Sequence, residues 1–138
     1  MGDQNVLTVN GLYKNIKSVC KFVAEGARNA GFNEDDTFRI ELACDEACTN
    51  IIEHAYGGEN KGSIRAEWSA TPSYFVILLH DNGRSFNPSK IPNPPEKPQN
   101  IDDLKIGGLG LHFIKKIMDD VAFTFGESGN TLTMKKKR

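Results

Sequence analysis

The chain lacks the features that mark membrane, secreted and charge-driven binding proteins. Its longest strongly apolar run, residues 75–79, is far short of the roughly 20 residues needed to cross a bilayer. Residues 1–5 have neither the basic stretch nor the apolar core of a signal peptide. A formal net charge of -1 gives no basic excess that would favour nucleic acid or an anionic membrane. We therefore expect a cytoplasmic protein that binds neither nucleic acid nor membranes.

Cysteine and aromatic residues are also scarce. The three cysteines, Cys20, Cys44 and Cys48, cannot all pair within one chain, and no nearby His or further Cys completes a zinc site. We expect them to be small buried core residues. Aromatic residues make up 9%, but the 38% of hydrophobic residues is too high for a disordered chain. A length of 138 residues predicts a single domain over residues 1–138.

Hydrophobic periodicity predicts an α+β fold. Asn33 is the expected N-cap of the second helix, and the nearly unbroken apolar run at 74–81 is typical of a strand covered on both sides. We expect a two-layer sandwich in which helices cover one face of a mixed, mostly antiparallel sheet. The predicted strands span residues 6–9, 62–69, 74–81, 121–125 and 131–135; the predicted helices span 12–30, 33–56 and a segment opened by the glycines at 107–110.

A proline-rich segment interrupts this pattern at residues 82–106. It holds five of the six prolines and shows no sustained periodicity. A loop of this length inside a compact domain is uncommon unless it is a functional lid or a disordered segment. We interpret it as a lid.

Three polar residues of the second predicted helix share one side of it. Glu46, Asn50 and Glu53 fall within roughly 60° of one another on a helical wheel. Apolar residues cluster on the opposite side: Ile40, Cys44, Ala47, Ile51 and Ala55. A solvated helix face would show the same stripe, so this stretch alone leaves both interpretations open.

Asp81 ends the apolar run on the same pleat face as Ile77 and Leu79. This position predicts a carboxylate at the edge of the core, able to accept a hydrogen bond from an exocyclic amine. Gly83 would leave room for a flat ring. A plain hairpin turn also explains Asp81-Asn82-Gly83, but no predicted strand follows it.

A glycine cluster opens the third predicted helix. Glycines let backbone N–H groups converge, and a helix N-terminus adds partial positive charge, so phosphate groups are stabilised there. The cluster lacks the Lys-Ser/Thr ending of a P-loop and the strand-glycine-helix context of a dinucleotide fold. It consists of Gly107, Gly108, Leu109 and Gly110.

Taken together and in this order, the three elements resemble the nucleotide site of the GHKL ATPases, which have a Bergerat fold. The segment Glu46 to Asn50 is similar to the N box, Asp81-x-Gly83 to the G1 box, and Gly107-x-x-Gly110 to the G2 box. The resemblance covers about residues 5–135. It is strongest to the anti-sigma-factor serine/threonine protein kinases, because Glu-Ala-x-Thr-Asn-x-x-x-His-Ala-Tyr and Gly-Gly-Leu-Gly-Leu are features of that branch.

This resemblance implies roles for individual residues in ATP-dependent phosphoryl transfer. Asn50 would hold Mg²⁺ through its carbonyl oxygen, and Glu46 would be the general base for a serine hydroxyl. Asp81 would bind the adenine amine, with Gly83 admitting the ring. The groups that would contact the phosphates of ATP are Lys105, Gly107, Gly108, Leu109 and Gly110.

The resemblance also implies partners. A kinase of this branch would bind a sigma factor in one state and phosphorylate a serine of an anti-anti-sigma protein in another. It would form a homodimer through the first strand and the first helix.

Two departures from the family pattern support a second hypothesis. Ser85 stands where the fuller G1 pattern has a glycine, and Ile106 stands where related kinases often have a basic residue. Both favour a non-catalytic switch module that binds ATP and sequesters a regulatory partner without transferring phosphate.

Overall fold

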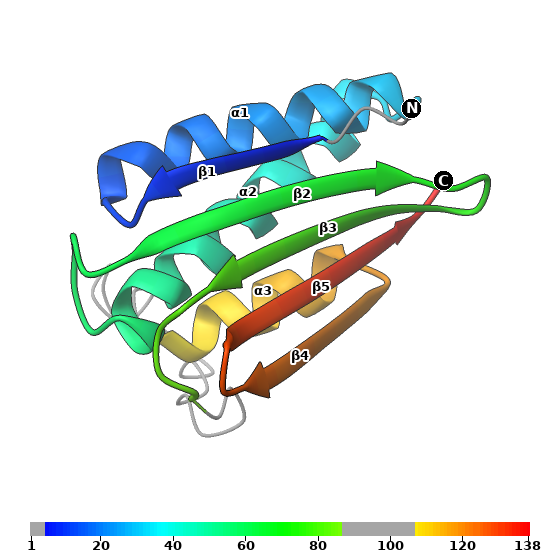
Figure 1. Cartoon of the computed structure of the whole chain (residues 1–138). Helices are drawn as coiled ribbons and strands as arrows, with labels where there is room; N and C mark the ends of the chain where they lie inside the picture. Colours follow the sequence, from blue (N-terminus) through cyan, green and yellow to red (C-terminus); the bar gives the residue numbers. More distant parts are fainter. Residues whose placement is uncertain (1–4, 87–106) are drawn as a thin grey trace, which may run out of the picture.

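The computed structural model describes residues 5–86 and 107–138, which form an α+β sandwich with helices on one face of a single sheet (Figure 1). The predicted fold class is confirmed. In chain order the elements are β1 (Val6–Asn10), α1 (Tyr13–Asn29), α2 (Glu34–Asn50), the π-helical turn η1 (Ile51–Ala55), β2 (Ser63–Ala70), β3 (Tyr74–Asp81), α3 (Gly107–Ile117), β4 (Asp120–Gly126) and β5 (Gly129–Lys137).

The sheet has five strands in the order β1-β2-β3-β5-β4. All four pairings between the described strands are antiparallel, so the expectation of a mixed sheet is wrong in this detail. Strands β2 and β3 are consecutive in the chain and pair as an antiparallel hairpin. Strand β3 lies in the centre, and its last residue, Asp81, pairs with Ile64 of β2 and Asn130 of β5. The carboxylate of Asp81 therefore projects from the middle of the sheet, at the end of its central strand.

Only one face of β3 is covered. Phe75, Ile77, Leu79 and Asp81 are buried, whereas the alternating residues from Tyr74 to His80 are partly exposed on the open face. The prediction that both sides of this strand are covered is therefore wrong. Residues such as Val76 and Leu78 make the open face of β3 apolar as well. Apolar composition therefore does not distinguish a strand that is covered on both faces from one that is covered on a single face.

The helices pack closely on the inner face of the sheet. A Cβ atom at Gly26 of α1 would lie 2.5 Å from the ring of Trp68 on β2, so only glycine permits this approach. Helix α2 begins as predicted, because the Asn33 side chain accepts a hydrogen bond from the Asp36 backbone nitrogen at 2.8 Å. Three acidic residues in the first turn of α2 complement its dipole: Glu34, Asp35 and Asp36.

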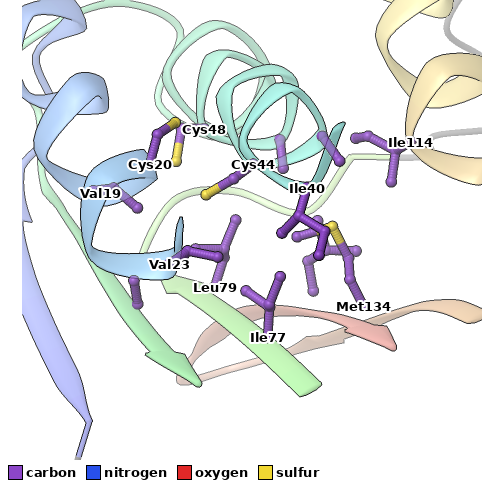
Figure 2. Packing of buried hydrophobic residues seen from close by; sticks show 14 of the residues in the cluster. Val19, Cys20, Val23, Ile40, Cys44, Cys48, Ile77, Leu79, Ile114 and Met134 are labelled. Carbon is purple, nitrogen blue, oxygen red and sulfur yellow. The ribbon is translucent and has the colours of Figure 1, made fainter. Parts of the chain in front are cut away.

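The core between the helices and the sheet contains all three cysteines (Figure 2). Cys20 of α1 lies beside Cys44 and Cys48 of α2, and each is a free, buried thiol, as expected. A hydrogen bond with Cys44, together with burial, raises the pKa of the Cys20 thiol. In the described parts of the chain no three His, Cys, Asp or Glu residues gather as metal ligands would. These cysteines thus contribute packing.

No helix in the described ranges combines the length and the apolar character required to span a bilayer. The most strongly amphipathic helix, α1, buries one face and exposes the other, as a helix does when it packs against a sheet.

Candidate nucleotide site

The last turn of the second helix is a π-turn. Helix α2 ends at Asn50, and η1 follows without a break, with the Tyr56 nitrogen donating to the Ile51 carbonyl at 3.0 Å. The sequence predicted a helix through about residue 56, which is correct in length but does not distinguish the final turn. Single π-turns within helices occur frequently at functional sites. This one lies directly after Asn50, the residue that the N-box resemblance assigns to Mg²⁺.

The predicted polar stripe of α2 divides into three environments. Asn50 is 6% exposed and lines a narrow cavity together with Ala47 and Ile51, which were expected on the opposite side. Glu46 is partly buried, and Glu53 is exposed. Burial raises the pKa of the Glu46 carboxyl, and the charges of Asp45 and Glu53 raise it further. A solvated helix face therefore does not describe Asn50.

Asp81 lies at the cavity as predicted, on the buried face of β3. The carboxylate is 3% exposed, and its Oδ1 accepts hydrogen bonds from the Gly83 nitrogen at 2.8 Å and from Asn130 Nδ2 at 2.9 Å. Burial raises the pKa of Asp81, while the hydrogen bonds from Gly83 and Asn130 and the nearby His80 act in the opposite direction. The bond to Gly83 closes a local turn, but β3 pairs with β2 and β5 and makes no hairpin at this turn, so the hairpin interpretation is wrong and the buried carboxylate is confirmed.

Gly83 is required by packing against η1. A Cβ atom at this position would lie 2.5 Å from the carbonyl oxygen of Ala55. The next residue, Arg84, donates its backbone N–H to the same oxygen at 2.9 Å and its Nε to the His54 carbonyl at 3.1 Å. The sequence interpretation gave Gly83 the role of admitting a flat ring; the structure gives it a direct backbone contact that holds the Asp81 turn against η1.

An aromatic cluster covers the cavity where the predicted lid begins. The Phe86 ring lies 5.7 Å from the His54 ring, 6.1 Å from Phe123 and 5.7 Å from Phe125, measured between centroids. The residues that line the cavity are Ala47, Asn50, Ile51, Asp81, Phe86, Phe123, Asn130, Thr131 and Leu132. A flat apolar ring with a hydrogen-bonding edge suits such a set, because aromatic walls stack on ring faces and Asp81 offers an acceptor.

One predicted site residue, Lys105, lies outside the described residues, as does most of the predicted lid, residues 87–106. The glycine cluster is described only as backbone: α3 begins at Gly107, so Gly107, Gly108, Leu109 and Gly110 form its first turn. A phosphate site at this helix start remains a prediction.

Sequence reasoning missed Asn130, Tyr56 and Phe86. Asn130 lies just before the predicted strand at 131–135, but it is the second residue of β5 and is 3% exposed. The Tyr56 hydroxyl donates to the Ser63 carbonyl and accepts from the Asn82 nitrogen. The sequence indicates no role for Tyr56 beyond its place in the N-box motif. The register that brings Asn130 opposite Asp81 would have identified it, had the strand order been known.

A larger hollow, of about 690 Å³, lies between α1 and α2. It shares no lining residue with the cavity at Asp81. Its walls are mainly apolar and include Phe38, although charged residues such as Lys17 and Glu41 also line it. The buried carboxylate, the buried carboxamides and the aromatic rings all line the smaller cavity, which is therefore the candidate nucleotide site.

Comparison with known proteins identifies the family of the chain. The family model of the histidine kinase-like ATPase domain matches residues 9–136. The serine-protein kinase RsbW of Bacillus velezensis is 33% identical over 113 residues, which is 80% of this chain and 70% of the relative. The serine-protein kinase RsbW of Staphylococcus aureus is 39% identical over 112 residues, or 78% of this chain and 69% of the relative.

Solved structures share the fold. The structure of the RsbU and RsbW domains of a Mycobacterium tuberculosis protein has a TM-score of 0.65 at 17% identity, covering 96% of this chain and 33% of that one. The catalytic domain of the histidine kinase ThkA has a TM-score of 0.56 at 19% identity, covering 96% of this chain and 97% of that domain. At these identities the likeness concerns the fold.

Proposed function

The chain belongs to the family of histidine kinase-like ATPase domains, and we propose that it is an ATP-dependent serine/threonine protein kinase acting as an anti-sigma factor. Its relatives named serine-protein kinase support the enzyme class. The observation that supports the nucleotide site most directly is Asp81, a buried carboxylate at an aromatic cavity with one oxygen already saturated by two donors.

Asp81 binds the adenine ring in this proposal. Its Oδ1 accepts from Gly83 and Asn130, which leaves Oδ2 to accept a hydrogen bond from the exocyclic amine of adenine. Phe86 and Phe123 provide apolar surface for the ring, so Phe86 must yield its place beside Phe123 when the base enters. Gly83 keeps the Asp81 turn seated against Ala55 while this happens.

Asn50 is the residue that fits Mg²⁺. Its side chain is 6% exposed, lines the same cavity as Asp81 and makes no hydrogen bond to another described residue. The amide oxygen of a buried side chain that no described residue hydrogen-bonds is a suitable hard ligand for a hard cation. When bound, Mg²⁺ would neutralise charge on the transferring phosphate. We therefore assign Asn50 as its protein ligand.

Glu46 accepts the proton of the attacking serine. It lies one helical turn before Asn50, and its raised pKa brings the carboxylate closer to the basicity that a general base requires near neutral pH. In the transfer, the serine oxygen forms a bond to the γ-phosphorus, the bond to the β-phosphate oxygen breaks, and the serine proton passes to Glu46. ADP leaves with the electron pair of the broken bond.

The other predicted contacts complete the proposal. Gly107, Gly108, Leu109 and Gly110 would receive the phosphates at the start of α3, and Lys105 would add a positive charge. The partners we propose are a sigma factor and an anti-anti-sigma protein that carries the accepting serine. We also propose a cytoplasmic homodimer.

A phosphotransfer assay tests this function. The chain is incubated with Mg²⁺, γ-labelled ATP and a panel of anti-anti-sigma proteins, and labelled phosphoserine is measured. The proposal predicts labelling of one such protein and its loss in a Glu46→Ala variant.

The second candidate is an ATP-binding switch that transfers nothing. Ser85 supports it, because its hydroxyl lies 3.4 Å from Asn130 Oδ1 and ties the start of the predicted lid to β5, where the family pattern has a freer glycine. This candidate predicts ATP binding with every serine unlabelled.

A further inference from the structure

The amide of Asn130 has one orientation that its surroundings permit. Its Nδ2 lies 2.9 Å from Asp81 Oδ1, 2.9 Å from the Arg84 carbonyl and 3.3 Å from the Gly83 carbonyl. The Ser85 hydroxyl lies 3.4 Å from Oδ1 of Asn130 itself and donates to it. A reversed amide would place its oxygen against three acceptors, which is repulsive. Asn130 therefore presents a donor to Asp81.

This donor determines which oxygen of Asp81 is available. A carboxylate oxygen has two lone pairs, and Oδ1 uses both, for the Gly83 nitrogen and for Asn130 Nδ2. Oδ2 has no hydrogen bond to another described residue. Because Asp81 Oδ1 accepts both of these hydrogen bonds, they favour the ionised carboxylate, which can only accept, over the protonated carboxyl group.

We propose that Asn130 is a specificity-determining residue, which holds Asp81 as an acceptor-only carboxylate and thereby selects a purine with an exocyclic amine over one with a carbonyl. The inference rests on the proposed function, since it assumes that the base binds at Asp81. It adds that selection depends on an amide from β5 that faces Asp81 across the sheet.

The electrostatics of the site explain why Asp81 needs this help. Its carboxyl is 3% exposed, and burial favours the protonated form. The other polar groups nearby are His80 on the same strand, the Tyr56 hydroxyl on the Asn82 nitrogen and the Arg84 guanidinium, which donates to the His54 carbonyl. None of these side chains is hydrogen-bonded to Asp81. Without Asn130 the carboxyl protonates more readily and becomes a donor that matches the O6 carbonyl of guanine.

Direct binding measurements test the proposal without reference to catalysis. The dissociation constants of ATP and GTP, each with Mg²⁺, are measured by calorimetry between pH 6 and pH 8.5 for the parent chain and for Asn130→Leu. Leucine has the same number and branching of side-chain heavy atoms, although it is bulkier, and it donates no hydrogen bond. Thermal unfolding of each variant checks that it is folded at the titration temperature.

The parent is expected to prefer ATP. For Asn130→Leu we expect the Kd of ATP to rise most at low pH, by about tenfold for each unit by which the pKa of Asp81 exceeds the pH, because only the ionised carboxylate accepts from adenine. The Kd of GTP should stay near its parental value or fall, so that the ratio of the Kd of GTP to the Kd of ATP decreases. The variant should also gain ATP affinity and lose GTP affinity as the pH rises, because only ionised Asp81 accepts from adenine.

Two further variants keep the test decisive. Asn130→Asp preserves the size of the side chain but replaces the donor by a second carboxyl, so one of the pair holds a proton and discrimination should again decrease. Met134→Ala removes a fully buried side chain from the same strand and should lower stability while leaving the nucleotide ratio unchanged. If Asn130→Leu does not fold, Asn130→Asp provides the comparison.

The outcomes separate the inference from the function on which it rests. A parent that binds neither nucleotide overturns both. A parent that prefers ATP, combined with Asn130 variants that keep the same ratio and parallel pH profiles, overturns only the specificity role. An equal fall in the ratio for Met134→Ala would also overturn it, because discrimination would then follow overall stability.

Discussion

The hydroxyl of Tyr56 lies 2.9 Å from the backbone nitrogen of Asn82 and accepts its hydrogen bond. The same hydroxyl donates to the Ser63 carbonyl at 2.5 Å. One side chain at the end of η1 therefore joins the end of β3 to the start of β2. Because Asn82 directly follows Asp81, this hydroxyl steadies the backbone that carries the carboxylate assigned to adenine.

The Tyr56→Phe variant removes this hydroxyl alone. We expect a loss of about 1–3 kcal/mol in the free energy of unfolding, because a part-buried donor and acceptor lose their partner. The Kd of ATP should rise several-fold as the Asp81 turn loosens. Denaturant unfolding and ATP titration measure the two effects.

Tyr74→Phe is the matched control. The Tyr74 hydroxyl makes no hydrogen bond to another described residue, so its removal should change neither quantity. Equal effects in the two variants would mean that the hydroxyl of Tyr56 has no particular role.

Gly83→Ala should separate the Asp81 turn from η1. The new Cβ would lie 2.5 Å from the Ala55 carbonyl oxygen and 2.8 Å from the Ala55 Cβ, so the backbone must shift. We expect destabilisation of about 1–3 kcal/mol, as for other overpacked sites, and weaker ATP binding. At Gly126 an added Cβ meets its nearest atom at 3.8 Å, so Gly126→Ala should be tolerated. Unchanged ATP affinity in Gly83→Ala would contradict the contact between turn and helix.

Glu46→Gln should separate activity from stability. Loss of the general base should slow phosphoryl transfer by about 10²- to 10⁴-fold while the Kd of ATP stays near its parental value. The pKa of Glu46 is raised in the folded chain by burial and by Asp45 and Glu53. Its contribution to stability is thus present below the ordinary carboxyl pKa and lost as the pH rises through the raised value.

At neutral pH the glutamine variant should therefore unfold at a slightly higher temperature than the parent, with the difference vanishing in acid. Transfer by the parent should increase with pH through the raised pKa of Glu46. Rapid transfer by Glu46→Gln at every pH would exclude Glu46 as the base.

Asn50→Ala should weaken nucleotide binding only where Mg²⁺ contributes. Titrations of ATP in the presence of Mg²⁺ and in the presence of a chelator give the gain in ATP affinity that the cation provides. We expect that gain to be large for the parent and small for the variant, because the amide oxygen is the proposed protein ligand. Asp45→Asn, on the same helix but lining the separate hollow, should keep the full gain. If Mg²⁺ increases the ATP affinity of Asn50→Ala as much as that of the parent, residues other than Asn50 bind the cation.

The sequence predicts most of the fold, because its signals are local. The helical period places α1 and α2, the Asn33 cap begins α2, and the alternation of Ile77, Leu79 and Asp81 places the carboxylate at the core edge. The unpredicted features depend on tertiary pairing. Asn130 acquires its role only when β5 pairs with β3, and a single five-residue π-turn after Asn50 is too short to show a changed hydrophobic period.

The site divides in the same way. Asp81 and Asn50 are recognisable from motif and spacing, and both line one cavity. Phe86 and Tyr56 act through contacts with residues distant in sequence, such as Phe123 and Ser63. Residue types alone do not indicate such contacts.

The central claim is that the cavity at Asp81 binds adenine nucleotides, and thermal unfolding with ligand tests it most directly. A ligand at 100 times its Kd stabilises the folded state by about 2.7 kcal/mol, which corresponds to several degrees in Tm for a chain of this size. The account predicts such a shift for the parent with Mg²⁺ and ATP or ADP, little with GTP, and little with any nucleotide for Asp81→Leu. No shift with any adenine nucleotide, or an equal shift in Asp81→Leu, would contradict it.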